Sequence, residues 1–341
     1  MHRVLIIRLS HMGDIILTEP VARAVKTVMP DCHVEFLTKS IYADVVGMFD
    51  AVDSVTTLEI PGPDSSIRGL SKAIRRLGND RYDFVFDLHS NIRSWLVKHQ
   101  VNAKKILTYP KNWRARKRAI RKKKRTSAAH TLDLYTTVLD KAGIEVQGDP
   151  PRVAIHQEAL GEATELLTGQ DIEPGKYCVL AVGASHPAKH YPIPQWVDLA
   201  GAIVDKFGLK VVVVEKEYLD YLNLFDELKD SGNAAIMTEL NIRVLGAVLE
   251  QSRFCISNDS GVMHLSAATG APTLGLFGPT HPSLGFAPLG DRCGAVTVNE
   301  SCSPCSKHGE SPCYREERFC FTRMTTDIIL QNLKEVMQNE N

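Results

Sequence analysis

The chain has 341 residues, of which 44% are hydrophobic and 23% charged, so it is long enough to form two globular domains with proper cores. Lysine plus arginine and aspartate plus glutamate both number 40, and this neutrality argues against a nucleic-acid-binding protein. We find neither a secretory signal nor a run of about 18 apolar residues, and therefore expect a cytoplasmic protein that does not span a membrane.

The first half of the chain alternates apolar strands with helical stretches. Val4–Leu9 is a continuous apolar run typical of a strand buried on both faces, and a helical pattern that starts at Asp14 ends near Met29. Further strands are predicted at Val34–Thr38, Phe84–Leu88 and Lys105–Tyr109, with helices at Ile67–Leu77 and Ile92–Gln100. This alternation predicts a parallel sheet that is covered by helices on both faces.

The same alternation restarts after the polar stretch Gln147–Pro151 and one bridging helix at Glu158–Leu167. Strands are predicted at Tyr177–Val182, Val211–Val214, Phe254–Ser257 and Pro272–Phe277, and helices at Ile193–Phe207, Gly261–Thr269 and Thr326–Met337. We therefore expect an α/β domain at 1–155, a linker with the bridging helix at 156–175, a second α/β domain at 176–325 and a C-terminal helix at 326–341. Two such doubly wound, Rossmann-like domains are expected to face each other across a cleft at the carboxyl ends of their strands, where sheets of this kind bind ligands.

The segment between the first strand and the first helix reads Ser10-His11-Met12-Gly13-Asp14. It has one glycine where the dinucleotide-binding fingerprint G-x-G-x-x-G has three, and this weakens the case for a nicotinamide-dependent oxidoreductase. Instead, Asp14 places a carboxylate at the edge of the sheet where ligands bind. On these residues alone, Asp14 is either a catalytic group or a helix cap.

Two segments of the second half suit a diphosphate. Ser257–His264 runs from a strand end into a helix whose free N–H groups and dipole favour an anion. The next strand leads into Gly275–Thr280, whose glycines expose further backbone N–H donors. The alternative is an ordinary capped helix with a histidine that faces the core.

Three motifs in this order and separation resemble those of glycosyltransferase family 9, the heptosyltransferases of bacterial lipopolysaccharide. They are S-x-M-G-D-x-x-x-T-x-P from Ser10 to Pro20, S-N-D-S-G-x-M-H from Ser257 to His264 and G-L-F-G-P-T from Gly275 to Thr280. The resemblance implies a GT-B fold with an N-terminal acceptor domain and a C-terminal nucleotide-sugar domain. It also implies inverting transfer of heptose from ADP-heptose to the lipopolysaccharide core on lipid A, without an obligatory metal.

By this resemblance, Asp14 aligns with the general base, which takes the proton from the acceptor hydroxyl. Lys189 aligns with the lysine that meets the donor phosphates, and Ser185 is a weaker candidate beside it. The further donor-side candidates are Asp259, Ser260, Gly261, His264, Phe277, Gly278, Pro279 and Thr280. The acceptor-side candidates are His11 and Gly13, together with Asp87, His89, Asn91 and Arg93, and these last four equally suit structural roles.

One departure from the family follows the strand Val211–Val214. The chain continues with charged residues where the family has a small Gly-rich turn. Glu215 or Asp220 is the candidate for the ribose hydroxyls, and the nucleotide base and the donor sugar stay open at this point.

The segment Lys111–Arg125 contains ten Lys or Arg in fifteen residues, together with Trp113. Such runs are often solvated loops. In an acceptor domain, the run suits a phosphorylated lipid or the anionic inner face of the inner membrane. A nonenzymatic binder of anionic polymers is the rival, although the neutral overall charge argues against nucleic acid.

Four cysteines follow the pattern C-x2-C-x7-C-x6-C at Cys302, Cys305, Cys313 and Cys320. The first pair has the spacing of metal ligands, so a structural zinc site within the loop 302–320 is predicted, separate from the catalytic chemistry. An iron–sulfur cluster, free thiols and redox disulfides are the alternatives.

Overall fold

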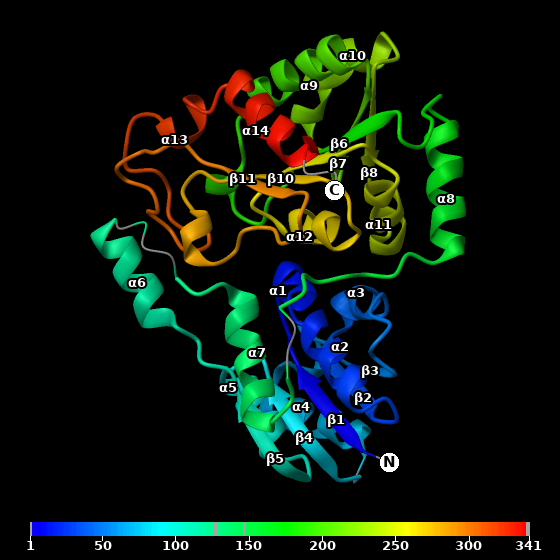
Figure 1. Cartoon of the computed structure of the whole chain (residues 1–341), viewed down its shortest axis with the longest axis vertical. Helices are drawn as coiled ribbons and strands as arrows, with labels where there is room; N and C mark the ends of the chain where they lie inside the picture. Colours follow the sequence, from blue (N-terminus) through cyan, green and yellow to red (C-terminus); the bar gives the residue numbers. More distant parts are fainter. Residues whose placement is uncertain (1, 79, 124, 126–127, 146–147, 339–341) are drawn as a thin grey trace. The chain divides into compact units, whose positions relative to one another are not determined.

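The computed structural model describes residues 2–78, 80–123, 125, 128–145 and 148–338, in two compact α/β units (Figure 1). The first unit comprises residues 1–112 and 131–154, and the second comprises residues 113–130 and 155–341. Three predictions fall partly outside the described residues. They involve Gln147 of the interdomain stretch, Lys124 of the basic run and residues 339–341 of the C-terminal segment.

The first unit is built on a five-stranded parallel sheet with the order β3-β2-β1-β4-β5. The strands are β1 (Arg3–Ile7), β2 (His33–Lys39), β3 (Ser54–Leu58), β4 (Tyr82–Asp87) and β5 (Ala103–Thr108). The helices are α1 (Met12–Ile16), α2 (Glu19–Val28), α3 (Ala43–Val46), α4 (Ile67–Ile74), α5 (Ile92–Lys98) and α7 (Thr131–Ala142), with short 3-10 turns η1 (Ser40–Tyr42), η2 (Pro63–Ser65) and η3 (Arg75–Leu77). β2 and β3 lie on one side of β1, and β4 and β5 lie on the other. The carboxyl ends of β1 and β4 therefore form the topological switch point.

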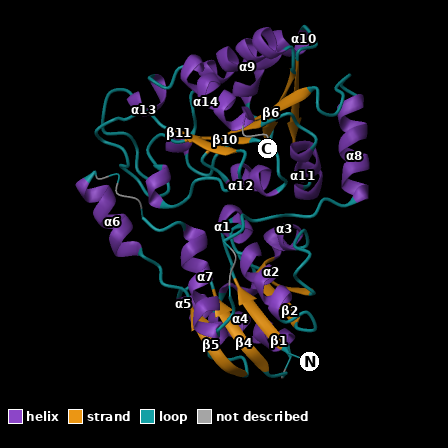
Figure 2. Ribbon diagram, viewed as in Figure 1, coloured by secondary structure: helices purple, strands orange, loops and turns teal. Residues whose placement is uncertain are grey.

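The second unit holds a six-stranded parallel sheet with the order β11-β10-β9-β6-β7-β8. The strands are β6 (Tyr177–Ala181), β7 (Lys210–Glu215), β8 (Ala234–Thr238), β9 (Cys255–Asn258), β10 (Thr273–Leu276) and β11 (Cys293–Val296). The helices are α6 (Trp113–Lys122), α8 (Gln157–Thr168), α9 (Ile193–Phe207), α10 (Asp226–Asp230), α11 (Ile242–Glu250), α12 (Gly261–Ala268), α13 (Phe319–Thr322) and α14 (Thr326–Gln338), with η4 (Pro187–Lys189), η5 (Asp220–Phe225) and η6 (Pro282–Leu284). Its switch point lies between β6 and β9, and Figure 2 shows helices on both flanks of the strands.

The central strands confirm the expectation of burial on both faces. Each of Val4, Leu5, Ile6 and Ile7 in β1 is fully buried, and the valines of β7 pack in the same way in the other sheet. A fully buried side chain of this size stabilises the fold by roughly 1.5–3 kcal/mol. The apolar runs therefore place β1 and β7 inside their sheets. In the part of the chain that the structure describes, no helix combines the length and the apolarity needed to cross a membrane.

The single helix predicted from Asp14 to Met29 is wrong in one respect. The structure breaks it into α1 and α2, which begins at Glu19 after the N-cap Thr18. Pro20 explains the break, because its ring lacks an N–H and clashes with the carbonyl four residues earlier in a continuous helix. At the first turn of a new helix, the same proline is well tolerated.

The structure divides the chain differently from the predicted boundary at residue 155. Residues 113–130, predicted to lie in the first domain, pack with the second unit instead. The buried Arg116 of α6 stacks over the ring of Phe286 at 4.4 Å, and Arg125 donates to Asn299 Oδ1 at 2.7 Å. The predicted bridging helix exists as α8, but it packs on α11 as part of the same unit.

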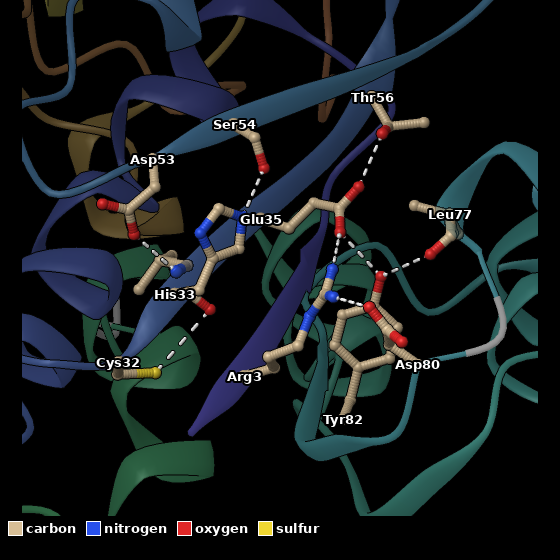
Figure 3. A network of polar contacts seen from close by, with 11 residues as sticks. Arg3, Cys32, His33, Glu35, Asp53, Ser54, Thr56, Leu77, Asp80 and Tyr82 are labelled. Atoms are coloured by element: carbon tan, nitrogen blue, oxygen red, sulfur yellow. Dashed lines mark hydrogen bonds and ion pairs between the residues drawn. The ribbon is translucent and has the colours of Figure 1, made fainter. Parts of the chain in front are cut away.

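A buried carboxylate at the amino end of the first sheet is fully paired (Figure 3). Glu35 accepts hydrogen bonds from Tyr82 Oη at 2.7 Å and Thr56 Oγ1 at 2.6 Å, and it lies 3.3 Å from the Arg3 guanidinium. Arg3 also pairs with Asp80 at the surface. Because a buried charge is costly unless it is paired, this network serves the stability of the unit at the edge opposite the carboxyl ends of the strands.

Candidate functional site

Asp14 lies just beyond the carboxyl end of β1, in the first turn of α1. Its Oδ2 is 2.5 Å from Arg8 Nη2, and its Oδ1 accepts a hydrogen bond from Tyr135 Oη at 3.2 Å. The N-cap position of α1 is occupied by His11. Asp14 is therefore held by Arg8, which directly follows β1, and by Tyr135 of α7, and it does not act as the helix cap.

Arg8 is an almost fully buried cation that organises this region. Its guanidinium donates to the carbonyl of Leu88 at 2.7 Å and lies 5.4 Å from the centroid of the Tyr135 ring. Burial lowers the pKa of Arg8, but Asp14, Tyr135 and Tyr109 together outweigh burial and raise the pKa above its ordinary value. Arg8 thus stays charged and holds Asp14 in one orientation.

The loop after β4 brings a neutral histidine to the same switch point. Burial, followed by the charges of Arg8 and Lys111, lowers the pKa of His89 to about 3. Its Nε2 lies 2.6 Å from Asn91 Nδ2, which donates to the neutral ring. Asn91 is also the N-cap of α5, since its Oδ1 accepts from the Ser94 N–H at 3.0 Å. Among the predicted acceptor-side residues, Asn91 therefore has a structural role as the helix cap, in addition to any ligand contact.

The lowered pKa of His89 predicts an acid-labile first unit. The ordinary pKa of histidine is 6.5. Between pH 6.5 and about 3, His89 is therefore protonated in the unfolded chain but neutral in the folded chain, and stability falls as the pH falls. At pH 5 the loss relative to pH 8 is about 2 kcal/mol. We expect His89→Gln, which keeps an acceptor for Asn91, to lose less stability over this range in chemical denaturation. The exposed His156→Gln is the control, and equal pH profiles for wild type and H89Q would contradict the assignment.

An open depression lies beside the same loop. It has a volume of about 340 Å³ and is lined by Asp87, Ser90, Asn91, Ile92, Trp95 and Lys98. Trp95 is 52% exposed, whereas the Asp87 carboxylate is occupied by Lys98 at 3.0 Å and by two backbone N–H groups. Half-buried Arg93 makes no hydrogen bond or ion pair with the described residues. The depression thus combines an exposed aromatic ring with amide and hydroxyl groups.

In the second unit, the switch point between β6 and β9 brings the two predicted anion-binding segments together. Lys189 Nζ lies 2.8 Å from Asp259 Oδ2 and donates to the Asp259 carbonyl at 3.1 Å. Both side chains are about nine-tenths buried. Lys189 comes from η4 after β6, and Asp259 follows β9 directly. A lysine and the N-terminus of α12 therefore meet at the position where doubly wound sheets bind ligands.

The loops around this pair are fixed by the side chain of Asn258. Its Nδ2 donates to the Val182 carbonyl at 2.6 Å, and its Oδ1 accepts from the Tyr191 N–H at 3.0 Å, so it ties β9 to both ends of the Lys189 loop. Ser260 is the N-cap of α12, yet its Oγ lies 3.2 Å from Ser257 Oγ and makes no cap hydrogen bond. The first N–H groups of α12 are therefore not capped by this side chain.

The remaining donor-side candidates differ in their exposure. Ser185 is exposed and Gly261 begins α12, so both are accessible. The side chains of Phe277, Thr280 and His264 are buried, with 0%, 3% and 7% of their surface exposed. Gly278 and Pro279 are buried as well, so the whole segment 277–280 belongs to the packing of the unit.

Glu215, rather than Asp220, lies at the end of a central strand. It is the last residue of β7, and a Cβ at Gly183 would stand only 2.4 Å from its Oε1. The Glu215 carboxylate therefore occupies the space beside Gly183, and a larger residue there would displace it. Tyr221 donates to Glu215 and keeps it in place, whereas Asp220 is exposed at the start of η5.

The four clustered cysteines also come together in the second unit. Cys302, Cys305, Cys313 and Cys320 line one cavity of about 20 Å³. The structure records all four as free thiols. Within the described residues, no three His, Cys, Asp or Glu side chains are already placed to hold a metal ion. The spacing thus gathers the sulfurs without bringing them to ligand geometry.

Known proteins with similar sequence and structure place the chain in one class. The family model described as glycosyltransferase family 9 (heptosyltransferase) matches residues 70–313. Lipopolysaccharide heptosyltransferase 1 of Pseudomonas aeruginosa is 25% identical over 98% of both chains. Among solved structures, a glycosyltransferase family 9 protein of Veillonella parvula superposes with a TM-score of 0.76 at 18% identity, covering 99% of this chain and 98% of its own. The E. coli heptosyltransferase WaaC with ADP gives a TM-score of 0.72 at 19% identity, covering 98% and 99%, and its complex with ADP-2-deoxy-2-fluoro heptose gives 0.67 at 20% with the same coverage.

The two doubly wound units and their likeness to these solved structures show the GT-B fold. The chain belongs to glycosyltransferase family 9, because the family model covers well over half of its length. The oxidoreductase and the nonenzymatic polymer binder, which the sequence left as alternatives, are replaced by this assignment.

Proposed function

We propose that the protein transfers heptose from ADP-heptose to an inner-core acceptor of lipopolysaccharide, with inversion at the anomeric carbon and with Asp14 as the general base. The observation that carries this proposal is the Asp14 carboxylate, held by Arg8 and Tyr135 at the end of β1 in a chain of family 9. The Pseudomonas aeruginosa relative is a lipopolysaccharide heptosyltransferase, and the E. coli heptosyltransferase WaaC has been solved with ADP and with ADP-2-deoxy-2-fluoro heptose.

In the proposed reaction, the acceptor hydroxyl gives its proton to Asp14 as its oxygen attacks the anomeric carbon. The bond from that carbon to the diphosphate breaks, and ADP leaves with the bonding electron pair. The negative charge that develops on ADP requires donors that are already in place. Lys189 and the N-terminus of α12 are suited to this role, so the reaction has no obligatory need for a metal ion.

The acceptor is proposed to lie against the first unit. Trp95 and the polar groups of the depression suit a sugar of the core oligosaccharide, and half-buried Arg93 is a cation available for a phosphate or carboxylate of the acceptor. Glu215 is the proposed partner of the ribose hydroxyls on the donor side, because a carboxylate accepts two hydrogen bonds from a diol.

An assay with a matched panel tests this function. Purified protein is given ADP-heptose, ADP-glucose or UDP-glucose with core acceptors that carry none, one or two heptoses on lipid A, and ADP release and product mass are measured. Transfer from ADP-heptose to a single acceptor is expected, and Trp95→Ala is expected to raise the KM for that acceptor while the KM for the donor stays unchanged. Transfer from UDP-glucose alone would replace the donor assignment with another nucleotide sugar.

We also propose that the protein works at the cytoplasmic face of the inner membrane and touches it through α6. Arg114, Lys117 and Arg121 recur on this helix and are exposed, and Trp113 at its start is 52% exposed. Each basic residue near an anionic surface contributes about 1 kcal/mol. Replacing the three with glutamine is therefore expected to weaken co-sedimentation with phosphatidylglycerol vesicles about 100-fold. Wild-type binding that is unchanged by this triple variant, or equally strong to neutral vesicles, would contradict the proposal.

A further inference from the structure

The cavity that the four cysteines line is also walled by the donor-side loops. Its lining includes Ala188, next to Lys189, and Pro279 of the Gly275–Thr280 segment. A volume of about 20 Å³ admits roughly one water-sized sphere or one ion. The segment between β11 and α13 contains no helix or strand, and every residue in it is described. Since no backbone ladder fixes this segment, the sulfurs of Cys302, Cys305 and Cys313 can close on an ion beside Cys320 of α13 without breaking regular structure.

The electrostatics of the cavity favour a bound cation. Cys302 and Cys320 are each only 8% exposed and Cys305 is half-buried, so three of the four sulfurs are withdrawn from solvent. Four mutually repelling sulfurs in one cavity are unfavourable as thiolates unless a positive charge lies among them. Arg315 supplies part of that charge, since its Nη1 donates to Cys302 Sγ at 3.8 Å, but the same guanidinium is also committed to Glu300 at 2.8 Å.

We propose that Cys302, Cys305, Cys313 and Cys320 bind one thiophilic transition-metal ion, and that this metal holds the two donor-side loops of the second unit in place. Four thiolates with a C-x2-C pair form a closed tetrahedral site, for which zinc is the commonest occupant and iron the alternative. On binding, the four S–H groups lose their protons to solvent and form four metal–sulfur bonds, without any change in oxidation state.

The contacts between the cysteine segment and the donor-side loops carry the second half of the proposal. Cys305 N–H donates to the Pro279 carbonyl at 2.9 Å, and Ser303 Oγ donates to the Gly278 carbonyl at 2.9 Å. Arg318 donates to three carbonyls of the Lys189 loop, those of Pro187, Ala188 and His190, at 3.0–3.4 Å.

The cysteine segment also touches Lys189 itself. A Cβ at Gly309 would stand 2.6 Å from Lys189 Cγ, so this segment passes directly over the lysine. The metal is thus expected to act on the donor through these loops and not by contact. This half of the proposal rests on the proposed donor site.

The test measures metal and nucleotide separately. The full chain is produced in defined medium containing both zinc and iron, purified under reducing conditions, and analysed for metal content and for thiols that react natively. About one metal ion per chain is expected, with four thiols becoming reactive only after chelation. Elemental analysis distinguishes zinc from iron, and either ion supports the site. A reduced chain that carries no metal and has four reactive cluster thiols overturns it, as does a disulfide found by mass within the cluster.

Variants then connect the metal to the donor loops. Cys313→Ser, at the exposed cysteine, is expected to lose the metal, lower the melting temperature and weaken ADP binding in calorimetry about 5–150-fold, the usual range of coupling between sites. Cys293→Ala removes a thiol of the same unit that lies outside the cavity. This variant should keep both the metal and the wild-type affinity for ADP. Unchanged ADP affinity in metal-free C313S overturns the coupling. If the variant fails to fold, the metal content of the wild-type chain still decides the site. If wild type binds metal but no nucleotide, the proposed function fails and the metal site stands.

Discussion

Asp14→Asn is expected to lower kcat by roughly 10²–10⁴-fold, the range for loss of an acid–base group, while donor affinity stays close to wild type. The asparagine side chain has nearly the same shape and can still contact Arg8 and Tyr135, so the structure of the first unit should survive. What it lacks is the ability to accept the proton of the acceptor hydroxyl. The measurement is single-turnover heptose transfer at saturating substrates, together with calorimetric titration of ADP.

Two further variants separate chemistry from structure. Tyr135→Phe removes the 3.2 Å hydrogen bond to Asp14 but leaves the base, and its effect should stay within about tenfold. Asp31→Asn changes an exposed carboxylate of the same unit and should have no effect. A fall of less than tenfold for D14N, with donor binding unchanged, would reduce Asp14 to a structural partner of Arg8.

Lys189→Ala is expected to weaken binding of the nucleotide sugar by about 10–150-fold, because a hydrogen bond to a charged group is worth roughly 1.5–3 kcal/mol. The loss has two sources. The ammonium group is missing, and the Asp259 carboxylate loses the partner that lies 2.8 Å away in the wild type. An unpaired carboxylate beside a diphosphate repels it. Asp259→Ala should also weaken the donor, by releasing Lys189 from its orientation.

The matched control is Lys206→Ala, an exposed lysine whose ion pair with Asp327 spans 3.3 Å at the surface. Such pairs contribute little, so donor affinity and stability should be close to wild type. Binding of the lipid acceptor, followed separately, should be retained in Lys189→Ala. Equal loss of both ligands would point to misfolding, and a donor affinity within twofold of wild type would remove Lys189 from the donor site.

The central strands were predictable because their apolar runs are unbroken, whereas three strands escaped prediction. β3, β8 and β11 all lie at sheet edges, where one side faces solvent and the sequence needs no continuous apolar run. β11 reads Cys-Gly-Ala-Val, with side chains too small to give a strand signal. The basic helix α6 escaped for another reason, since only Arg116 and Ala119 of its residues are buried. Its helical face depends on packing that local sequence does not encode.

The candidate site was predictable where a motif is local. Asp14, Lys189 and Asp259 were found from short segments at strand ends, although their roles stay predictions. Arg8 and Tyr135 were missed, because Tyr135 lies 121 residues from Asp14 and only the tertiary fold brings α7 to β1. Trp95 was missed because an exposed tryptophan on a helix has no motif. One local signal could have identified Arg8, because it is a charged residue that directly follows a buried strand.

The division of the chain into units has a consequence for the order in which they form on the ribosome. The polypeptide passes between the two units three times, near residues 112, 130 and 154. Domains generally fold as they emerge, with the N-terminal one first. Here the first unit needs α7 before it is complete, and α6 has by then been synthesised without Phe286, the ring on which its Arg116 packs in the second unit. For about 160 further residues of synthesis, this basic helix therefore lacks the packing that it has in the finished protein.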